Sequence, residues 1–371
     1  MPSELTIPLF AIHHHKIGGT ESAIYNLIHG LDKAKAALTL AFSDPDRLSP
    51  EFLRWMAKSP AIAQQRQYPL PGKNSRFAEE LLFEWRRSGN GWAVYPNYFL
   101  PPRRPGSRAK SAVILHDIQY KVLPQYHSSK RKAWLDFYLP RMFQTADLVF
   151  LISNSEKEYV RQHFGDAAAD KCKVIYNAIE WARLEQGDIS EATRKLAGRP
   201  YILTVSHPFP HKNLGVLIKA FDRVAQSNSE IELYLAGKAS DEKTRLIREN
   251  ASEKTAARIV MTGILSDADL GELYRNARLF VLPSLYEGFG MPAAEAMGFG
   301  VPTLVSGVTS LPEATLGKAE YVADPKNVEA WAEQMTGCLN SGKRLSTETV
   351  AEVREAFAPH RVAQSLLQNL G

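Results

Sequence analysis

Short apolar runs alternate with amphipathic stretches along the first half of the chain. The runs have the length expected of strands that are buried in a parallel sheet. They lie at residues 5–12, 36–42, 92–95, 111–115, 147–152 and 173–176. Between the first two runs, Ala23, Leu27 and Leu31 are apolar residues at helical spacing. This alternation predicts a parallel sheet whose strands are connected by helices.

The same alternation starts again after a polar stretch at residues 177–199 that carries no strand signal. The second set of apolar runs lies at residues 201–205, 231–235, 258–261, 278–282 and 301–305. Two successive sets predict an α/β protein with two Rossmann-like domains, each a doubly wound parallel sheet. We place the first domain at residues 1–182 and the second at residues 183–355. Ligands of such sheets bind at the carboxyl ends of the strands, where the glycine-rich and charged motifs of this chain fall.

The most specific motif begins directly after one of these runs. It reads Pro-Ser-Leu-Tyr-Glu-Gly-Phe-Gly-Met-Pro-Ala-Ala-Glu from Pro283 to Glu295. Its glycines allow a tight turn, and Pro292 is well placed as the first residue of a helix. Glu287 would lie in the loop and Glu295 in the first helical turn, where each carboxylate can accept hydrogen bonds from a diol. A capping carboxylate is the common alternative at a helix start, but two carboxylates in this setting favour a functional site.

Three further motifs follow strand ends. Lys212 precedes Asn213, which we expect to cap a helix, and a cation there suits the charge of a diphosphate leaving group; a solvated surface lysine is the alternative. Gly18 and Gly19 allow the backbone to approach a ligand closely, although any strand-to-helix turn can use glycine. His116 also follows a strand, and a single histidine in such a place is more often structural.

Two Asp-x-Asp triplets have the spacing of some metal–nucleotide sites. Asp44 and Asp46 flank a proline and fit a turn, while Asp267, or Ser266 before it, fits the N-cap of a helix. We therefore assign no metal site. The histidines at residues 13–15 receive no role.

The composition limits the remaining function classes. A length of 371 residues fits about two domains. The 2 cysteines lie far apart, no apolar run reaches the ~18 residues of a membrane span, and the N-terminus does not resemble a signal peptide. We therefore expect a reduced, cytoplasmic protein. The formal net charge of +5 fits an anionic ligand, an anionic membrane or a nucleic acid, and does not choose among them.

Basic and aromatic residues are interleaved in one part of the first half. Basic segments at residues 103–110 and 130–132 occur close to Tyr126, Trp134 and Phe137. Such a surface fits contact with an anionic bilayer, and a solvated helix with a buried aromatic side fits equally well. Because the net charge is modest and the aromatic residues have helical spacing, we expect no nucleic-acid partner.

Together these residues resemble the retaining glycosyltransferases of family 4, which have the GT-B fold of two Rossmann-like domains facing each other across a cleft. The resemblance covers nearly the whole chain, and Glu287 and Glu295 match the E-x7-E motif of that family. It implies that Glu287 holds the hydroxyls of the donor sugar together with backbone N–H groups of Phe289, Gly290 and Met291. It also implies that Glu295 holds the ribose diol.

In the second domain, the resemblance implies a nucleotide site. Lys212 matches the phosphate-binding lysine of the family, and Gly263 and Ile264 lie where the backbone reads the base. The family usually has an arginine where this chain has His207. A neutral histidine supplies less charge to the leaving phosphate, so His207 is a departure from the family pattern.

In the first domain, the resemblance implies an acceptor site. Gly18 and Gly19 resemble the glycine loop that lies over the diphosphate. His116 resembles the histidine that contacts the donor sugar near the anomeric centre. The last helix, expected at residues 356–371, would cross back onto this domain.

The expected function is retaining transfer of a hexose from a nucleotide diphosphate sugar, with GDP-mannose as the preferred donor and no cofactor. Lys212 and His207 would stabilise the leaving diphosphate, while Glu287 orients the sugar and His116 supports the oxocarbenium-like centre. The acceptor would be a glycan or a lipid-linked sugar in lipopolysaccharide or exopolysaccharide assembly, with peripheral contact to an anionic inner membrane. A UDP-sugar-dependent transferase and a nucleotide-sugar epimerase on the same fold are the alternatives.

Overall fold

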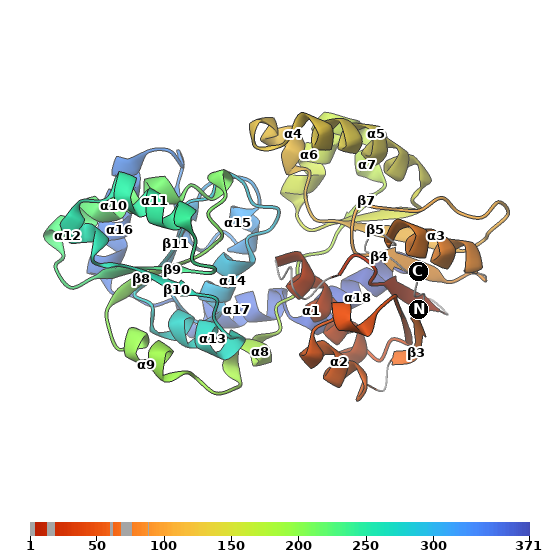
Figure 1. The fold of residues 1–371 in the computed structure, drawn as a ribbon, viewed down its shortest axis with the longest axis horizontal. Coiled ribbons are helices and arrows are strands. Elements are labelled where there is room, and N and C mark those ends of the chain that lie inside the picture. The colour runs from red at the N-terminus through yellow and green to blue at the C-terminus, as the bar shows by residue number, and fades with distance from the viewer. Residues whose placement is uncertain (1–3, 13–18, 60–61, 68–75, 88) are drawn as a thin grey trace. The chain divides into compact units, whose positions relative to one another are not determined.

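The computed structural model describes residues 4–12, 19–59, 62–67, 76–87 and 89–371 (Figure 1). The chain forms two compact units. The first unit comprises Met1–Ile179 and Phe357–Gly371, and the second comprises Glu180–Ala356. The boundary expected after residue 182 therefore lies after Ile179, and the last helix belongs to the first unit.

The first unit is built on a seven-stranded parallel sheet with the strand order β3-β2-β1-β4-β5-β6-β7. Its strands are β1 (Leu5–Pro8), β2 (Leu38–Phe42), β3 (Ile62–Gln67), β4 (Trp92–Tyr95), β5 (Lys110–Leu115), β6 (Leu148–Leu151) and β7 (Cys172–Val174). Its helices are α1 (Gly19–Lys33), α2 (Pro50–Met56), α3 (Arg76–Arg86), α4 (Gln119–Val122), α5 (Ser129–Thr145), α6 (Asn154–Phe164), α7 (Asp166–Asp170) and α18 (Pro359–Leu370), with short 3-10 turns η2 (Pro45–Arg47) and η3 (Pro124–Tyr126).

The second unit repeats this plan with a six-stranded parallel sheet in the order β10-β9-β8-β11-β12-β13. Its strands are β8 (Tyr201–Val205), β9 (Glu232–Ala236), β10 (Ile259–Gly263), β11 (Leu279–Leu282), β12 (Thr303–Ser306) and β13 (Glu320–Val322). Its helices are α8 (Trp181–Glu185), α9 (Glu191–Ala197), α10 (Leu214–Ser227), α11 (Asp241–Asn250), α12 (Glu253–Ala256), α13 (Asp267–Asn276), α14 (Met291–Gly298), α15 (Leu311–Ala314), α16 (Val328–Ser341) and α17 (Thr347–Ala356), with a 3-10 turn η4 (Pro210–Lys212).

The predicted α/β class with two doubly wound parallel sheets is confirmed. Two edge strands escaped the prediction. The sequence of β3 is Ile-Ala-Gln-Gln-Arg-Gln, which is too polar to resemble a buried strand, and β13 has only three residues. A strand at the edge of a sheet has a neighbouring strand on one side only, and its other side is open to solvent. Such a strand needs fewer apolar residues than a central strand.

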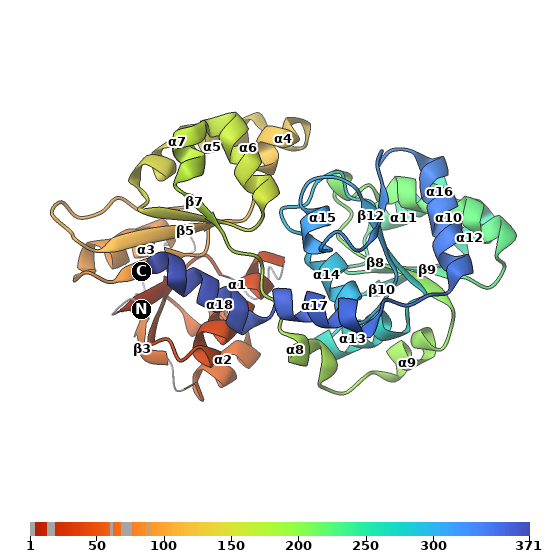
Figure 2. The same ribbon diagram turned by 180° about the vertical axis from the view of Figure 1, so that it is seen from behind.

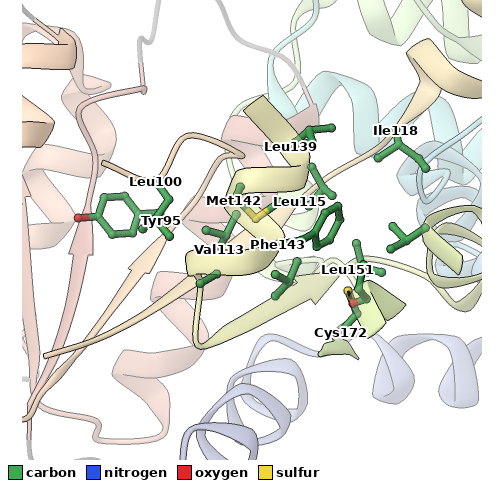
Figure 3. Packing of buried hydrophobic residues seen from close by; sticks show 14 of the residues in the cluster. Tyr95, Leu100, Val113, Leu115, Ile118, Leu139, Met142, Phe143, Leu151 and Cys172 are labelled. Atoms are coloured by element: carbon green, nitrogen blue, oxygen red, sulfur yellow. Dashed lines mark hydrogen bonds between the residues drawn. The ribbon is translucent and has the colours of Figure 1, made fainter. Parts of the chain in front are cut away.

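A layer of apolar side chains joins the helices of the first unit to its sheet. Leu139, Met142 and Phe143 of α5 pack over Val113 of β5 and Leu151 of β6 (Figure 3). In the second unit, separate apolar clusters cover the two faces of the sheet. Within the described ranges, no helix is both long enough and apolar enough to cross a membrane.

The last helix, α18, lies against α1, far from it in sequence (Figures 1 and 2). The two helices touch at Gly30 of α1. A Cβ atom at this position would come within 2.0 Å of the carbonyl oxygen of Pro359. Because backbone cannot move aside as a side-chain tip can, only glycine allows the helices to approach so closely.

We expect Gly30→Ala to lower the free energy of unfolding by about 1–3 kcal/mol, because the overpacking exceeds the gain in helix propensity. The matched control is Gly337→Ala in α16, where nothing lies within 4 Å of the new Cβ. That change should raise stability by up to about 1 kcal/mol. Urea unfolding of both variants measures the difference, and equal effects would rule out a close contact at Gly30.

Candidate functional site

The loop between β11 and α14 carries the motif that sequence analysis singled out. Its last residue, Gly290, has a φ of 100° and occupies the N-cap of α14. A Cβ atom there would lie 2.7 Å from Cδ2 of Leu311. The side chains of Phe289 and Met291 are buried. Glycine is therefore required at 290 for both backbone conformation and space, and its buried neighbours hold the turn in place.

Glu287 forms an ion pair with Lys212 from the turn that follows β8. The Lys212 Nζ atom lies 2.8 Å from Oε1 and 2.9 Å from Oε2 of Glu287. The side chains are only 20% and 10% exposed, respectively. The Ser284 hydroxyl donates a further hydrogen bond of 2.6 Å to Oε1. The carboxylate and the ammonium are thus brought together and oriented, although they are 75 positions apart in the sequence.

Asn213 explains how the turn bearing Lys212 is held against the β11–α14 loop. Its side-chain amide donates to the carbonyl oxygens of Pro283 at 3.1 Å and Pro325 at 2.6 Å. The N–H of Leu285 also donates to the carbonyl of His211 at 2.7 Å. Asn213 precedes α10, as predicted, but its side chain does not cap that helix. It bridges two loops instead.

The segment after β12 supports the same loop from the other side. The Thr309 hydroxyl accepts a hydrogen bond of 3.1 Å from the backbone N–H of Glu287. The Ser310 hydroxyl lies 2.8 Å from the carbonyl oxygen of Glu287 and 2.9 Å from that of Phe289. Sequence analysis assigned no role to Ser284 or Thr309. A small hydroxyl residue beside a loop is too common for the sequence to single it out.

Glu295 lies in a different environment from Glu287. It occupies the second turn of α14, whereas the first turn was predicted, because the helix begins at Met291. The carboxylate is 6% exposed and accepts a 2.9 Å hydrogen bond from the hydroxyl of Tyr274. Burial raises the pKa of Glu295, and the positive charge of Arg183 opposes that shift. Glu295 is therefore a buried acceptor fixed by α13 rather than a helix cap.

The ends of β8, β9 and β10 form the neighbouring part of the site. The N–H of Gly237 donates to the carbonyl of Gly263 at 3.1 Å, and the side chain of Ile264 is exposed. His207 follows β8 and is exposed, yet nearby protein atoms partly desolvate its ring. This desolvation, followed by the charges of Lys243 and Lys212, lowers the pKa of His207. The lysines near His207 suit an anionic ligand.

The first-unit residues with predicted roles are only partly described. Gly19 begins α1, while Gly18 and the histidines at 13–15 lie outside the described residues. The Nε2 atom of His116 lies 3.2 Å from the carbonyl oxygen of Pro96. Desolvation lowers the pKa of His116, and Asp117 opposes that shift. The net shift favours the uncharged form of the ring.

The Asp-x-Asp triplets have structural roles. Asp44 accepts a hydrogen bond of 3.0 Å from the N–H of Asp46, as a turn residue does. Of the two residues that could cap α13, Ser266 is the cap, and Asp267 pairs with Arg183 at 3.0 Å. In the described part of the chain, no three His, Cys, Asp or Glu side chains form a group that would hold a metal ion.

Two family models match the two halves of the chain. Residues 17–183 match Glycosyltransferase Family 4, and residues 185–355 match Glycosyl transferases group 1. The chain belongs to the group 1 and family 4 glycosyltransferases. The matches cover the segments that contain His116, Lys212 and both carboxylates of the E-x7-E motif.

Curated relatives of this glycosyltransferase include two proteins of Escherichia coli. It is 31% identical to O-antigen chain mannosyltransferase B over 239 residues. That alignment covers 63% of this chain and 61% of the relative. It is 34% identical to the serotype-specific mannosyltransferase WbdA over 206 residues. That alignment covers 52% of this chain and 25% of the relative. The alignments thus span less than two thirds of the length of these relatives.

Solved structures show the same fold. Sucrose-phosphate synthase from Thermosynechococcus elongatus aligns with a TM-score of 0.72 at 18% identity, covering 99% of this chain and 98% of that one. HepE of Anabaena, solved in complex with UDP and glucose, aligns with a TM-score of 0.72 at 17% identity, covering 99% of both chains. The glycosyltransferase therefore has the predicted GT-B fold.

Lys212→Met should lower the free energy of unfolding by about 1–3 kcal/mol, because it leaves the largely buried carboxylate of Glu287 without its cation. Adding Glu287→Gln should recover part of that loss, since the neutral amide does not need a counter-ion. Lys219→Met is the control, since Lys219 is exposed on α10. Urea unfolding of the three variants measures the effect. A double variant no more stable than Lys212→Met would argue against the ion pair.

Proposed function

We propose that this glycosyltransferase transfers mannose, with retention of configuration, from GDP-mannose to a glycan or lipid-linked acceptor. The names of its relatives support mannose as the sugar, since O-antigen chain mannosyltransferase B and WbdA are both named as mannosyltransferases. The same names support a place in O-antigen or related polysaccharide assembly. We further propose that the protein works on the cytoplasmic face of an anionic membrane.

The ion pair between Lys212 and Glu287 is the observation that carries the proposal. An ammonium has three N–H groups, and two of them point to the Glu287 oxygens. The third remains for a phosphate oxygen of the donor. Glu287, held by Ser284, keeps lone pairs for the hydroxyls of the sugar. The pair thus offers one group to each side of the bond that breaks, between the anomeric carbon and the diphosphate.

The neighbouring residues would complete the donor site. Backbone N–H groups of Phe289, Gly290 and Met291 would join Glu287 in binding the sugar. Glu295 would accept hydrogen bonds from the ribose diol, with Tyr274 holding its other side.

The remaining assignments concern the base and the anomeric centre. Gly263 and Ile264 would contact the base, which suits an exposed apolar side chain at a strand end. From the first unit, His116 would support the oxocarbenium-like centre and the loop at Gly18 and Gly19 would approach the diphosphate. Because the lowered pKa of His116 favours the uncharged ring, His116 would act through its ring dipole and backbone rather than as a cation.

A panel of nucleoside diphosphates tests the donor class. We expect GDP to raise the melting temperature more than UDP, ADP, CDP or TDP, because GDP is the nucleotide of the proposed donor. A ligand at about 100 times its Kd adds about 2.7 kcal/mol of stability. GDP-mannose incubated with an α-mannoside should yield GDP and a longer glycan. Stabilisation by UDP alone would favour the UDP-sugar-dependent alternative, and interconversion of the donor sugar without acceptor would identify an epimerase.

Glu287→Ala sharpens the assignment within the site. We expect it to abolish transfer while GDP binding largely survives, because this carboxylate is assigned to the sugar. The control is Glu329→Ala, since Glu329 lies on the surface of the same unit and pairs with Arg223. Loss of GDP binding in Glu287→Ala would contradict the role assigned to the carboxylate.

A pH series tests His207. Its pKa lies below the ordinary value in the free protein, and a bound polyanion raises it, so donor binding takes up a proton. Affinity for GDP-mannose should therefore rise severalfold as the pH falls from about 8 to about 6. The diphosphate of a nucleotide sugar does not titrate in this range, which leaves the protein as the source. His207→Asn should flatten the profile measured by calorimetry, and an unchanged slope would remove His207 from the diphosphate site.

A further inference from the structure

Helix α3 of the first unit has its carboxylates inside and three of its large apolar side chains outside. Glu79, Glu80 and Glu84 are at most 1% exposed. Phe77 is 51% exposed, Leu81 39% and Trp85 52%. The spacing of four residues places these three on one face of the helix. Phe83 is buried in the core beside the carboxylates. An ordinary surface helix instead turns most of its apolar residues to the core and its charged residues to water.

Ion pairs keep the helix in this orientation. Glu84 accepts hydrogen bonds from Arg87 at 2.8 and 3.0 Å and from the hydroxyl of Tyr95 at 2.6 Å. Glu79 pairs with Arg47 at 3.3 Å, and Glu80 with Arg76 at 3.2 Å. Rotating α3 to bury its apolar face would expose these pairs and strand Arg87 in the interior. The outward apolar face is therefore a fixed feature of the fold.

Ring contacts connect this face to α5. Phe77 lies 4.7 Å from Phe99, Phe99 lies 5.3 Å from Tyr138, and Tyr138 lies 5.3 Å from Trp134, measured between ring centroids. Trp134 and its neighbour Phe137 are exposed. Together, Phe77, Leu81, Trp85, Trp134 and Phe137 form what we call the α3–α5 surface.

Cations accompany these side chains. The guanidinium of Arg76 lies 5.5 Å from the ring centre of Phe77, and that of Arg141 lies 3.6 Å from the ring centre of Phe137. Arg86 of α3 and Lys130 and Arg131 of α5 are exposed. The carboxylates of α3 all face inward. On α5, Asp136 is exposed but pairs with Lys121 at 2.7 Å.

We propose that the α3–α5 surface docks this protein onto an anionic lipid bilayer. Apolar and aromatic side chains enter the interface while neighbouring Lys and Arg pair with anionic headgroups, and the two contributions together give stable binding where one alone is marginal. The docking surface rests on the proposed function in one respect: a transferase that acts on a membrane needs a surface that binds the bilayer.

Other occupants fit the charges less well. A second copy of this chain would bring the same cations against one another, which like-charge repulsion opposes. A neutral glycan would leave the cations without partners. A nucleic acid would pair with the cations, but its phosphates would contact Leu81 of the α3–α5 surface, which has no polar group to offer them. An anionic bilayer satisfies both the apolar and the basic groups.

Vesicle flotation tests the proposal. The full chain should bind vesicles with about 30% phosphatidylglycerol at least about tenfold better than pure phosphatidylcholine vesicles. The triple variant Phe77→Ser, Leu81→Ser, Trp85→Ser should lose at least about tenfold in binding. Because these side chains are exposed, its melting temperature and its GDP binding should match those of the wild type. A wild type that does not bind, or a triple variant that binds equally well, would overturn the proposal.

A double substitution that removes two positive charges from α5 gives a second, independent readout and does not alter α3. Lys130→Gln with Arg131→Gln should weaken binding to the anionic vesicles severalfold, whereas Lys195→Gln with Lys254→Gln, in the second unit, should not. Equal effects would show that net charge alone drives binding and would overturn the assignment of this surface. A wild-type dimer that the triple variant dissociates, or binding to a random oligonucleotide that it abolishes, would do the same.

The vesicle result and the proposed function can fail separately. Transfer to a soluble α-mannoside does not need a membrane, so it should be unchanged in the triple variant. Vesicle binding without transfer would leave the docking surface standing and refute the proposed activity. Transfer without vesicle binding would do the reverse.

Discussion

The second unit depends on one electrostatic constraint, the need to keep Lys212 and Glu287 together away from bulk water. Removing two charges from solvent is costly unless each finds the other and further hydrogen bonds complete their shells. The chain meets this need with the amide of Asn213 and the hydroxyls of Ser284 and Thr309. None of them is required by the parallel sheet itself. They make sense as the support of a site whose two charged groups must be in place before a ligand arrives.

The two carboxylates of the E-x7-E motif show how one short segment supports two kinds of recognition. Glu287 lies beside an ammonium and is therefore coupled to whatever anion Lys212 meets. Glu295 is buried beneath Tyr274, and its raised pKa reflects desolvation that no adjacent cation fully offsets. Hydroxyl donors that reach Glu295 would restore part of its lost solvation. Its environment therefore favours a neutral, hydroxyl-rich partner, whereas Glu287 lies beside a cation that can meet an anion.

Sequence reasoning reached the class of the fold and the position of the motif because both are local. A buried parallel strand needs a continuous apolar run, and the turn at Gly290 needs glycine. It did not reach the contacts that depend on distant segments. Lys212 and Glu287 were assigned separate ligands with no indication that they touch. Asn213 looked like a helix cap because its position before α10 is visible in the sequence, whereas the carbonyls it bridges are not.

Helix α3 shows the same limit in a sharper form. A segment with three glutamates and five large apolar residues has the pattern of an amphipathic helix, and the usual expectation places the glutamates in water. The positions of Arg47, Arg87 and Tyr95 decide otherwise, because each lies where an inward carboxylate can meet it. With the carboxylates and Phe83 inside, Phe77, Leu81 and Trp85 lie on the other face of the helix and are exposed. A buried polar network on one side of a helix thus creates an apolar surface on the other, and the exposed aromatic residues of α3 follow from the ion pairs behind them.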